Sequence, residues 1–203
     1  NGEIYITSEH AILNMAYQEK TKVPKKAVPL LKIKGEELIG AKITAPLSIL
    51  KEVYLFPMET ISMSKGTGIV TSVPSDSPDD YINLLLFKND EKLRKKWGIT
   101  PEMIFDPIHI ISLEGFSGLA AKDMVEKLNI KSPKDKDKLQ KAKEEVYTAG
   151  FYKGVIDIGP YKGQLVKDVK DKVKKDLIKS GEADTYFEPE CLVKNRIGEE
   201  CVD

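Results

Sequence analysis

Residues 66–80 read GTGIVTSVPSDSPDD and join an extended run to the start of a helix. The two glycines that open the stretch let the backbone bend before the β-branched residues that follow. In Ser77-Pro78-Asp79-Asp80 the serine suits the N-cap, the proline suits the first helical position, and the carboxylate of Asp80 can reach back to the capping backbone amide. The stretch therefore predicts a strand followed directly by a helix.

Three acidic residues, Asp76, Asp79 and Asp80, crowd this junction, although a helix cap requires only one. A carboxylate beside a bent strand can also receive the ammonium group of a ligand, because a charge in a partly dry pocket is better paired than left bare. The residues alone leave two compatible roles open for Asp80, helix capping and ligand binding.

Outward from the junction, the first half of the chain is patterned mainly as strands. Runs of β-branched and aromatic residues bounded by Gly and Pro predict strands over 2–7, 28–34, 37–46, 51–57 and 67–73. A helix is expected over 8–18, where Ser8 or Thr7 can cap the N-terminus. Five short, closely spaced strands predict a bent β-sheet or a β-barrel.

The second half is patterned as helices. They are expected over 78–97, 117–129, 133–149 and 164–180, each with a cap or a terminal glycine. Two further strands, over 107–114 and 154–159, are expected to return to the sheet. The predicted fold class is α+β, with a bent β-sheet or β-barrel core and surrounding helices.

Length and composition favour one large domain over residues 1–203, since 41% of the residues are hydrophobic. The lysine and aspartate run after Pro133 is the most linker-like region, and residues 115–152 could form a helical lobe inserted into the β core. The 32 basic and 32 acidic residues cancel, so net charge does not indicate a nucleic acid or a membrane as partner. Basic helix faces are nevertheless expected over 88–98 and 162–180.

The sequence does not indicate a disulfide framework, a metal site, a catalytic histidine or a membrane span. Cys191 and Cys201 form no C-x-x-C pair and are interpreted as ordinary thiols, so neither a disulfide framework nor a metal site is predicted. His10 and His109 are isolated in the sequence, without a G-x-S-x-G motif. No apolar run approaches the length of a membrane span, and a reducing cytosol fits the cysteine content best.

The run GTGIVTSVPSDSPDD resembles the matching run of the editing domain of leucyl-tRNA synthetases, in their cytosolic eukaryotic form. The V-P-S-D-S-P-D-D continuation distinguishes it from isoleucyl and valyl relatives, which share only the opening. Further matches follow in order along the chain: GEIYI, AxxNMAYQ, GxxLIGAxxxAPL, KxWGI, GFSGLAA, KGQLVKDVK, FEPE and GEEC. The resemblance covers most of the chain and implies the editing-domain fold of class I aminoacyl-tRNA synthetases.

The resemblance also implies an activity: hydrolysis of the ester that joins a wrong amino acid to the terminal adenosine of tRNA. Asp80 matches the acid that holds the substrate's α-ammonium group while water attacks. Other positions match substrate-binding residues near the adenosine and the acyl group: Ile61, Ser62, Lys65, Thr71, Val73 and Ser77. Bacterial members often carry Tyr, Met and Asp where this chain has Lys65, Thr71 and Ser77.

The implied partners are the mischarged 3′ end of tRNA(Leu) and the remainder of a cytoplasmic synthetase, with no membrane. Editing is expected to need no cofactor, since ATP serves only a synthetic domain that is absent from this chain. The family's T-x-R-P-E-T type element is also absent from these residues. Two alternatives stay open: a non-catalytic tRNA-binding or docking module, and a β-barrel protein-interaction domain.

Overall fold

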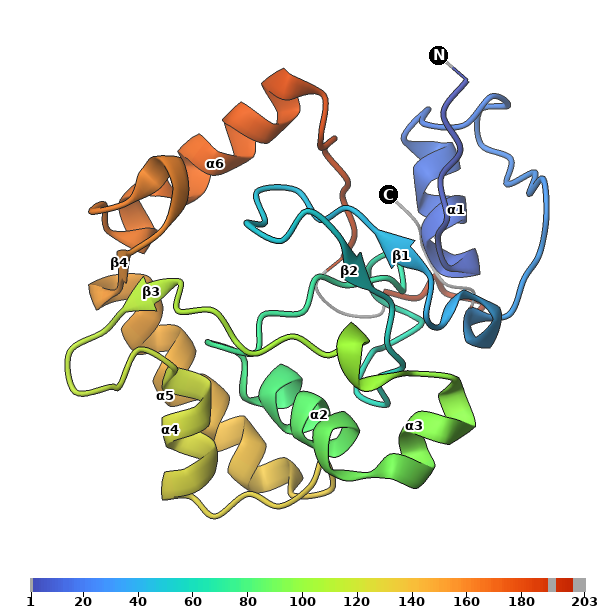
Figure 1. The fold of residues 1–203 in the computed structure, drawn as a ribbon. Helices are drawn as coiled ribbons and strands as arrows, with labels where there is room; N and C mark the ends of the chain where they lie inside the picture. Colours follow the sequence, from blue (N-terminus) through green and yellow to red (C-terminus); the bar gives the residue numbers. More distant parts are fainter. Residues whose placement is uncertain (1, 190–192, 199–203) are drawn as a thin grey trace. The chain divides into compact units, whose positions relative to one another are not determined.

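The computed structural model describes residues 2–189 and 193–198 (Figure 1). The chain forms two compact units. Unit 1 comprises Asn1–Ile33, Ile61–Val70 and Ala183–Asp203. Unit 2 comprises Lys34–Thr60 and Thr71–Glu182.

Unit 1 is organised around helix α1 (Glu9–Tyr17). As predicted, Ser8 caps this helix, because its Oγ accepts a hydrogen bond from the Ala11 amide over 3.2 Å. The side-chain Nε2 of Gln18 donates to the Phe187 carbonyl oxygen over 2.6 Å, and the Phe187 backbone N–H donates to Oε1 of Gln18 over 3.0 Å. These reciprocal bonds hold the segment that follows Ala183 against the end of α1.

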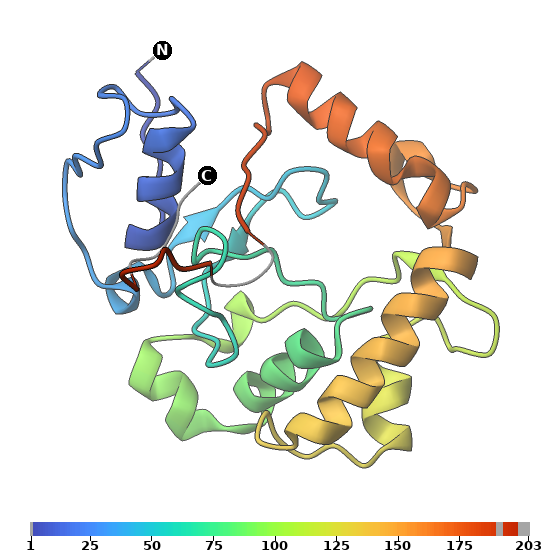
Figure 2. The ribbon, with the colours of Figure 1, turned by 180° about the vertical axis from the view of Figure 1, so that it is seen from behind.

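Unit 2 contains helices α2 (Pro78–Asn89), α3 (Glu91–Trp97), α4 (Ala120–Lys127), α5 (Lys136–Lys153) and α6 (Val166–Ser180). Figures 1 and 2 show α5 beside both α2 and α4. Small side chains at Ala120, Ala121 and Ala142, all nearly inaccessible to solvent, let these helices approach closely. The rest of their core is Tyr81, Ile82, Met124, Val125, Ile130, Leu139 and Val146.

The strands of unit 2 are short and form two separate antiparallel pairs. Strand β1 (Lys42–Ile43) pairs with β2 (Val53–Tyr54), with Lys42 opposite Tyr54. Strand β3 (Ile111–Ser112) pairs with β4 (Val155–Ile156), with Ile111 opposite Ile156. Short 3₁₀ helices occur at Gly35–Leu38, Pro101–Met103 and Gly159–Tyr161.

The predicted bent sheet or β-barrel core is wrong for the residues that the structure describes. Within them, segments 2–7, 28–34 and 67–73 are assigned no strand, and β3 and β4 pair with each other instead of joining a common sheet. Strand-forming side chains without a ladder partner stay in solvent: Ile4 is 74% exposed and Leu30 is 84% exposed. The buried core of unit 2 is helical instead.

Two helix boundaries also differ from the prediction. The helix expected over 78–97 is interrupted at Asp90, whose Oδ1 accepts from the Leu93 amide and so caps α3. Arg94 donates to the carbonyl oxygens of Phe87 and Lys88, which closes the end of α2. Helix α5 continues through Gly150, where it was expected to end, to Lys153.

Helices α4 and α5 account for most of residues 115–152, and both share their core with α2. That this range is an inserted lobe stays a prediction. Among the helices of the described residues, none combines the length and the apolar character that a bilayer crossing demands.

Candidate functional site

The first turn of α2 carries the predicted site. Ser77 has extended backbone angles and caps the helix, with the Asp80 amide 3.5 Å from its Oγ. Pro78 is buried at the first helical position. This part of the junction forms as predicted.

The Asp80 carboxylate does not reach back to the capping amide, so that part of the prediction is wrong. Its Oδ2 accepts from the Val73 amide over 2.7 Å. The Ser77 amide donates instead to the Val73 carbonyl oxygen over 2.8 Å. Asp80 therefore fastens the end of the extended segment to its own helix.

The intervening turn is anchored to another helix. Ser75 is almost completely buried, and its carbonyl oxygen accepts from the Ala121 amide at the start of α4 over 3.0 Å.

The bend predicted at the start of the 66–80 stretch is also present, since Gly66 and Gly68 both have positive φ. At Gly68 an added Cβ would lie 3.3 Å from Cε of Met63, so the position has little spare room.

Burial raises the pKa of the Asp80 carboxyl above its ordinary value. Hydrogen bonds with the Val73 amide and the Ser77 side chain act in the opposite direction. The negative charge of Asp79 adds to the rise and the positive charge of Lys143 reduces it. An approaching cation would therefore find a half-buried carboxylate whose charge is costly to leave unpaired.

The two neighbouring acids have partners of their own. Oδ2 of Asp79 lies 2.8 Å from Nζ of Lys143, and both side chains are mostly shielded from solvent, with exposures of 15% and 31%. Asp76 accepts from the Ser75 hydroxyl over 2.5 Å, and burial raises the pKa of Asp76. The excess of acids at the junction is thus divided among separate contacts.

Helix α5 contributes two residues that the sequence did not point to. Besides Lys143, the Tyr147 hydroxyl donates to Oγ of Ser77 over 3.1 Å. The two side chains are four residues apart and so lie on one face of α5. Their helical spacing is visible in the sequence, but their contact with residues 77 and 79 depends on how α5 packs on α2.

The remaining predicted residues fall into two groups. Thr71 is exposed and lies two residues before Val73, which is half-buried. Ile61, Ser62 and Lys65 belong to unit 1, where Oγ of Ser62 lies 3.0 Å from Oγ of Ser64. Unit 2 thus brings together Val73, Ser77 and Asp80, which carry the geometry of the candidate site.

His109, isolated in the sequence, has polar neighbours in the fold. Its Nδ1 lies 3.5 Å from Oδ2 of Asp157, and its Nε2 lies 3.3 Å from Oγ of Ser112. Lys162 also pairs with Asp157, over 3.1 Å, and holds the pKa of that carboxyl below its ordinary value. A carboxylate already paired with lysine is poorly placed to activate the imidazole, so the cluster is interpreted as a structural contact.

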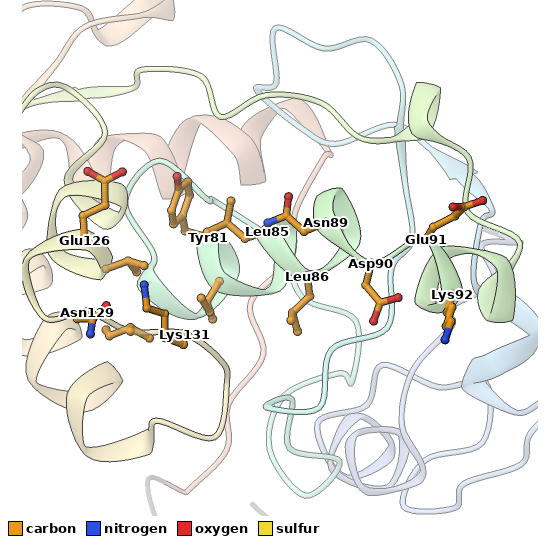
Figure 3. A pocket seen from close by; sticks show the side chains of 13 residues that line it. Tyr81, Leu85, Leu86, Asn89, Asp90, Glu91, Lys92, Glu126, Asn129 and Lys131 are labelled. Carbon is orange, nitrogen blue, oxygen red and sulfur yellow. The ribbon is translucent and has the colours of Figure 1, made fainter.

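A groove of about 840 Å³ lies elsewhere in unit 2 (Figure 3). Leu85, Leu86, Ile82 and Val125 form part of its apolar lining, and α2, the start of α3 and the end of α4 supply its walls. Asp90, Glu91, Lys92, Glu126 and Lys131 give its rim charges of both signs. The groove is lined by a different set of residues from the predicted site.

Metal ligation was not predicted. Across residues 2–189 and 193–198, no group of three or more His, Cys, Asp or Glu side chains is arranged to hold a metal ion. Cys191 and Cys201 lie outside the described residues.

The chain is similar to known proteins in sequence and in fold, although no family model matches it. The cytoplasmic leucine–tRNA ligase of Pongo abelii is 45% identical over 205 residues, which cover 100% of this chain and 17% of that protein. The chain thus spans about a sixth of the length of this curated relative.

Solved structures from leucyl-tRNA synthetases are also similar to this chain. The structure of the P. knowlesi cytosolic leucyl-tRNA synthetase editing domain superposes with a TM-score of 0.82 at 34% identity and covers 92% of this chain and 67% of that chain. A structure named GlLeuRS-CP1 gives a TM-score of 0.80 at 38% identity and covers 91% of this chain and 70% of that chain. The fold is therefore that of an aminoacyl-tRNA synthetase component. Within that class, the chain belongs to the family of cytosolic leucyl-tRNA synthetase editing domains.

Proposed function

We propose that this chain hydrolyses the ester bond of tRNA(Leu) that carries an amino acid other than leucine, after the amino acid has been transferred to the tRNA. Membership of the editing-domain family supports the reaction class. The observation that carries the assignment of Asp80 is its half-buried carboxylate, fixed to the Val73 amide at the start of α2.

In this mechanism, Asp80 binds the α-ammonium group of the misattached amino acid. Water attacks the ester carbonyl carbon, the bond to the ribose oxygen breaks, and a proton from the water ends on that oxygen. An aminoacyl ester is already activated, so orienting the ester and the water and stabilising the oxyanion supply most of the rate. A carboxylate anchored through a backbone amide is suited to that orienting role.

The remaining substrate contacts are also proposals. The residues that would contact the terminal adenosine or the acyl group are those that the resemblance implies: Ile61, Ser62, Lys65, Thr71, Val73 and Ser77. Selectivity has to reject leucine, because a single pocket discriminates one methylene by only about 1–3 kcal/mol and editing supplies a second selection. Editing would need no cofactor, and ATP would serve only the synthetic part of the parent enzyme, which would be cytoplasmic like its named relatives.

The test uses the complete synthetase that contains this chain, with tRNA(Leu) charged with isoleucine as substrate. Asp80→Ala should leave leucylation intact and slow the release of isoleucine at least about 100-fold, as expected when a substrate-orienting charge is lost. Asp168→Ala is the matched control, because Asp168 is an exposed acid in the first turn of α6. Unchanged deacylation by Asp80→Ala would reject the catalytic assignment.

A second candidate is a non-catalytic tRNA-binding or docking module, and helix α6 favours it. This helix carries six lysines against three aspartates, and Val169 is its buried residue. Such a face can neutralise phosphates, which would make tRNA binding strongly dependent on salt. If Asp80→Ala deacylates normally while substitution of the α6 lysines weakens tRNA binding, the binding module is the better description.

A further inference from the structure

Helix α5 reaches the start of α2 with two polar side chains. Nζ of Lys143 lies 2.8 Å from Oδ2 of Asp79, and the Tyr147 hydroxyl donates to Oγ of Ser77 over 3.1 Å. The two contacts are made on either side of Pro78 and within three residues of Asp80. We refer to Lys143 and Tyr147 together as the α5 clamp.

We propose that the α5 clamp positions Asp80 for editing, with Lys143 neutralising Asp79 and Tyr147 fixing the Ser77 cap. The inference rests on the proposed function, because it assigns roles to residues that act through Asp80. Lys143 and Tyr147 are thus positioning residues, with no direct contact to the reacting atoms required.

Packing of α2 on α5 does not need the clamp. The apolar side chains of Leu139, Ala142 and Val146 on α5 are buried in the same cluster as Tyr81 and Ile82 of α2. Tyr147, in contrast, is 49% exposed, so its hydroxyl contact adds little buried surface. The polar contacts are added at the first turn of α2, beside these buried residues.

The charge arrangement explains why Lys143 is needed. Asp79 and Asp80 are adjacent acids, and an unpaired Asp79 would compete with Asp80 for a substrate ammonium group. Within the part of the chain that the structure describes, Asp79 on the same helix and Lys143 on α5 are the charged groups that shift the pKa of Asp80. With Lys143 paired to Asp79, Asp80 is left as the carboxylate available to a ligand cation.

The hydroxyl of Ser77 links Tyr147 to the site. Its oxygen accepts from Tyr147, and the Asp80 amide lies 3.5 Å from the same oxygen. Because the Ser77 oxygen accepts from Tyr147, the hydrogen of the Ser77 hydroxyl is free to be donated to the Asp80 carboxylate. A hydrogen bond between Ser77 and the Asp80 side chain favours the ionised carboxylate and lowers its pKa. Loss of the Tyr147 hydroxyl would loosen this chain of contacts while leaving the aromatic ring in place.

The experiment measures kcat and KM for deacylation of isoleucyl-tRNA(Leu) by the complete synthetase. Lys143→Gln and Tyr147→Phe should each lower kcat by about 3- to 10-fold, the equivalent of one lost hydrogen bond, with leucylation unchanged. Lys143→Arg should restore most of the rate. Lys141→Gln and Tyr152→Phe are matched controls, since both side chains are exposed on the same helix and lie outside the clamp.

A pH profile separates positioning from a purely structural role. Lys143 lowers the pKa of Asp80, so Lys143→Gln should raise that pKa and move the acid limb of the deacylation profile to higher pH. Lys141→Gln should leave the limb in place. Neutralising both partners, in Asp79→Asn with Lys143→Gln, should return kcat toward the wild-type value, because no bare acid then remains beside Asp80.

The experiments distinguish failure of the α5 clamp proposal from failure of the proposed editing function. If Asp80→Ala abolishes deacylation while Lys143→Gln and Tyr147→Phe retain wild-type kcat and pH profile, the clamp is rejected and the editing assignment stands. If Asp80→Ala deacylates normally, both proposals fall. Thermal unfolding of every variant identifies any rate loss that comes from unfolding rather than from positioning.

Discussion

The backbone amide nitrogen of Val73 lies 2.7 Å from Oδ2 of Asp80. The carbonyl oxygen of Val73 accepts from the Ser77 amide in addition, so both backbone groups of Val73 contact the first turn of α2. This arrangement joins the cap of α2 to the carboxylate that we propose binds the substrate. A carboxylate that is already ordered loses little further conformational freedom when it binds a cation.

Replacing the Asp80 carboxylate by an amide should separate its two roles. In Asp80→Asn the side-chain oxygen can still accept from Val73, so the free energy of unfolding should stay within about 1 kcal/mol of wild type. In Asp80→Ala that amide loses its partner, and a loss of about 1–3 kcal/mol is expected. Both variants should slow deacylation at least about 100-fold, because both lose the substrate-orienting charge. Denaturant unfolding measures the difference, and equal stabilities of the two variants would contradict the importance of the Val73 bond.

The stability of unit 2 should depend on the ionisation of Asp76. Burial raises the pKa of Asp76 above its ordinary value of 3.8, and the hydrogen bond from the Ser75 hydroxyl and then the charge of His109 partly oppose that rise. Between 3.8 and the raised value the folded chain holds a proton that the unfolded chain releases, so the free energy of unfolding falls as pH rises through this window.

The measurement compares wild type with Asp76→Asn, which cannot ionise. Wild type should lose stability relative to the variant as pH rises from about 3 to 7, in the direction that this linkage requires. The comparison cancels the opposite contributions of other acids with lowered pKa values, such as Asp106 and Asp135, because both proteins contain them. A difference that is independent of pH would show that Asp76 is not perturbed by burial.

The core between α2, α4 and α5 should respond to loss of volume. Met124 has no exposed surface, so Met124→Ala should lower the free energy of unfolding by about 2–5 kcal/mol. Leu30→Ala is the control, since Leu30 is 84% exposed in unit 1 and its truncation should change stability by no more than about 0.5 kcal/mol. Equal effects of the two substitutions would contradict the helical core.

The sequence predicted the elements whose signals are local. Ser8 and Ser77 cap helices because the chemistry of an N-cap lies within three residues, and Gly98 and Gly181 end helices in left-handed conformation. The break at Asp90 also had a local signal, an aspartate followed by a glutamate. The hydrophobic pattern continues across Asp90, so one uninterrupted helix was predicted.

Contacts that depend on packing were beyond sequence reasoning. Strand patterns over 2–7 and 28–34 do not specify a partner, and the structure assigns no strand to either run. Asp80 can accept a hydrogen bond from the Val73 amide because the chain turns at Pro74, Ser75 and Asp76. Helix α4 holds this turn through the hydrogen bond from the Ala121 amide to the Ser75 carbonyl oxygen. Lys143 is one of many lysines until α5 is placed beside α2.

The loop before α4 offers a test of packing against His109. Gly118 has a φ of +96°, and an added Cβ would lie 3.1 Å from the imidazole ring, so Gly118→Ala should cost about 1–3 kcal/mol through backbone strain and crowding. Gly115 has a φ of +84° but open space around it, so Gly115→Ala isolates the contribution of the backbone. Adding His109→Ala to Gly118→Ala should recover part of the loss, because the ring that meets the new methyl group is gone. If the double variant is no more stable than the sum of its single substitutions predicts, the close approach of Gly118 to the ring is not what makes this position sensitive.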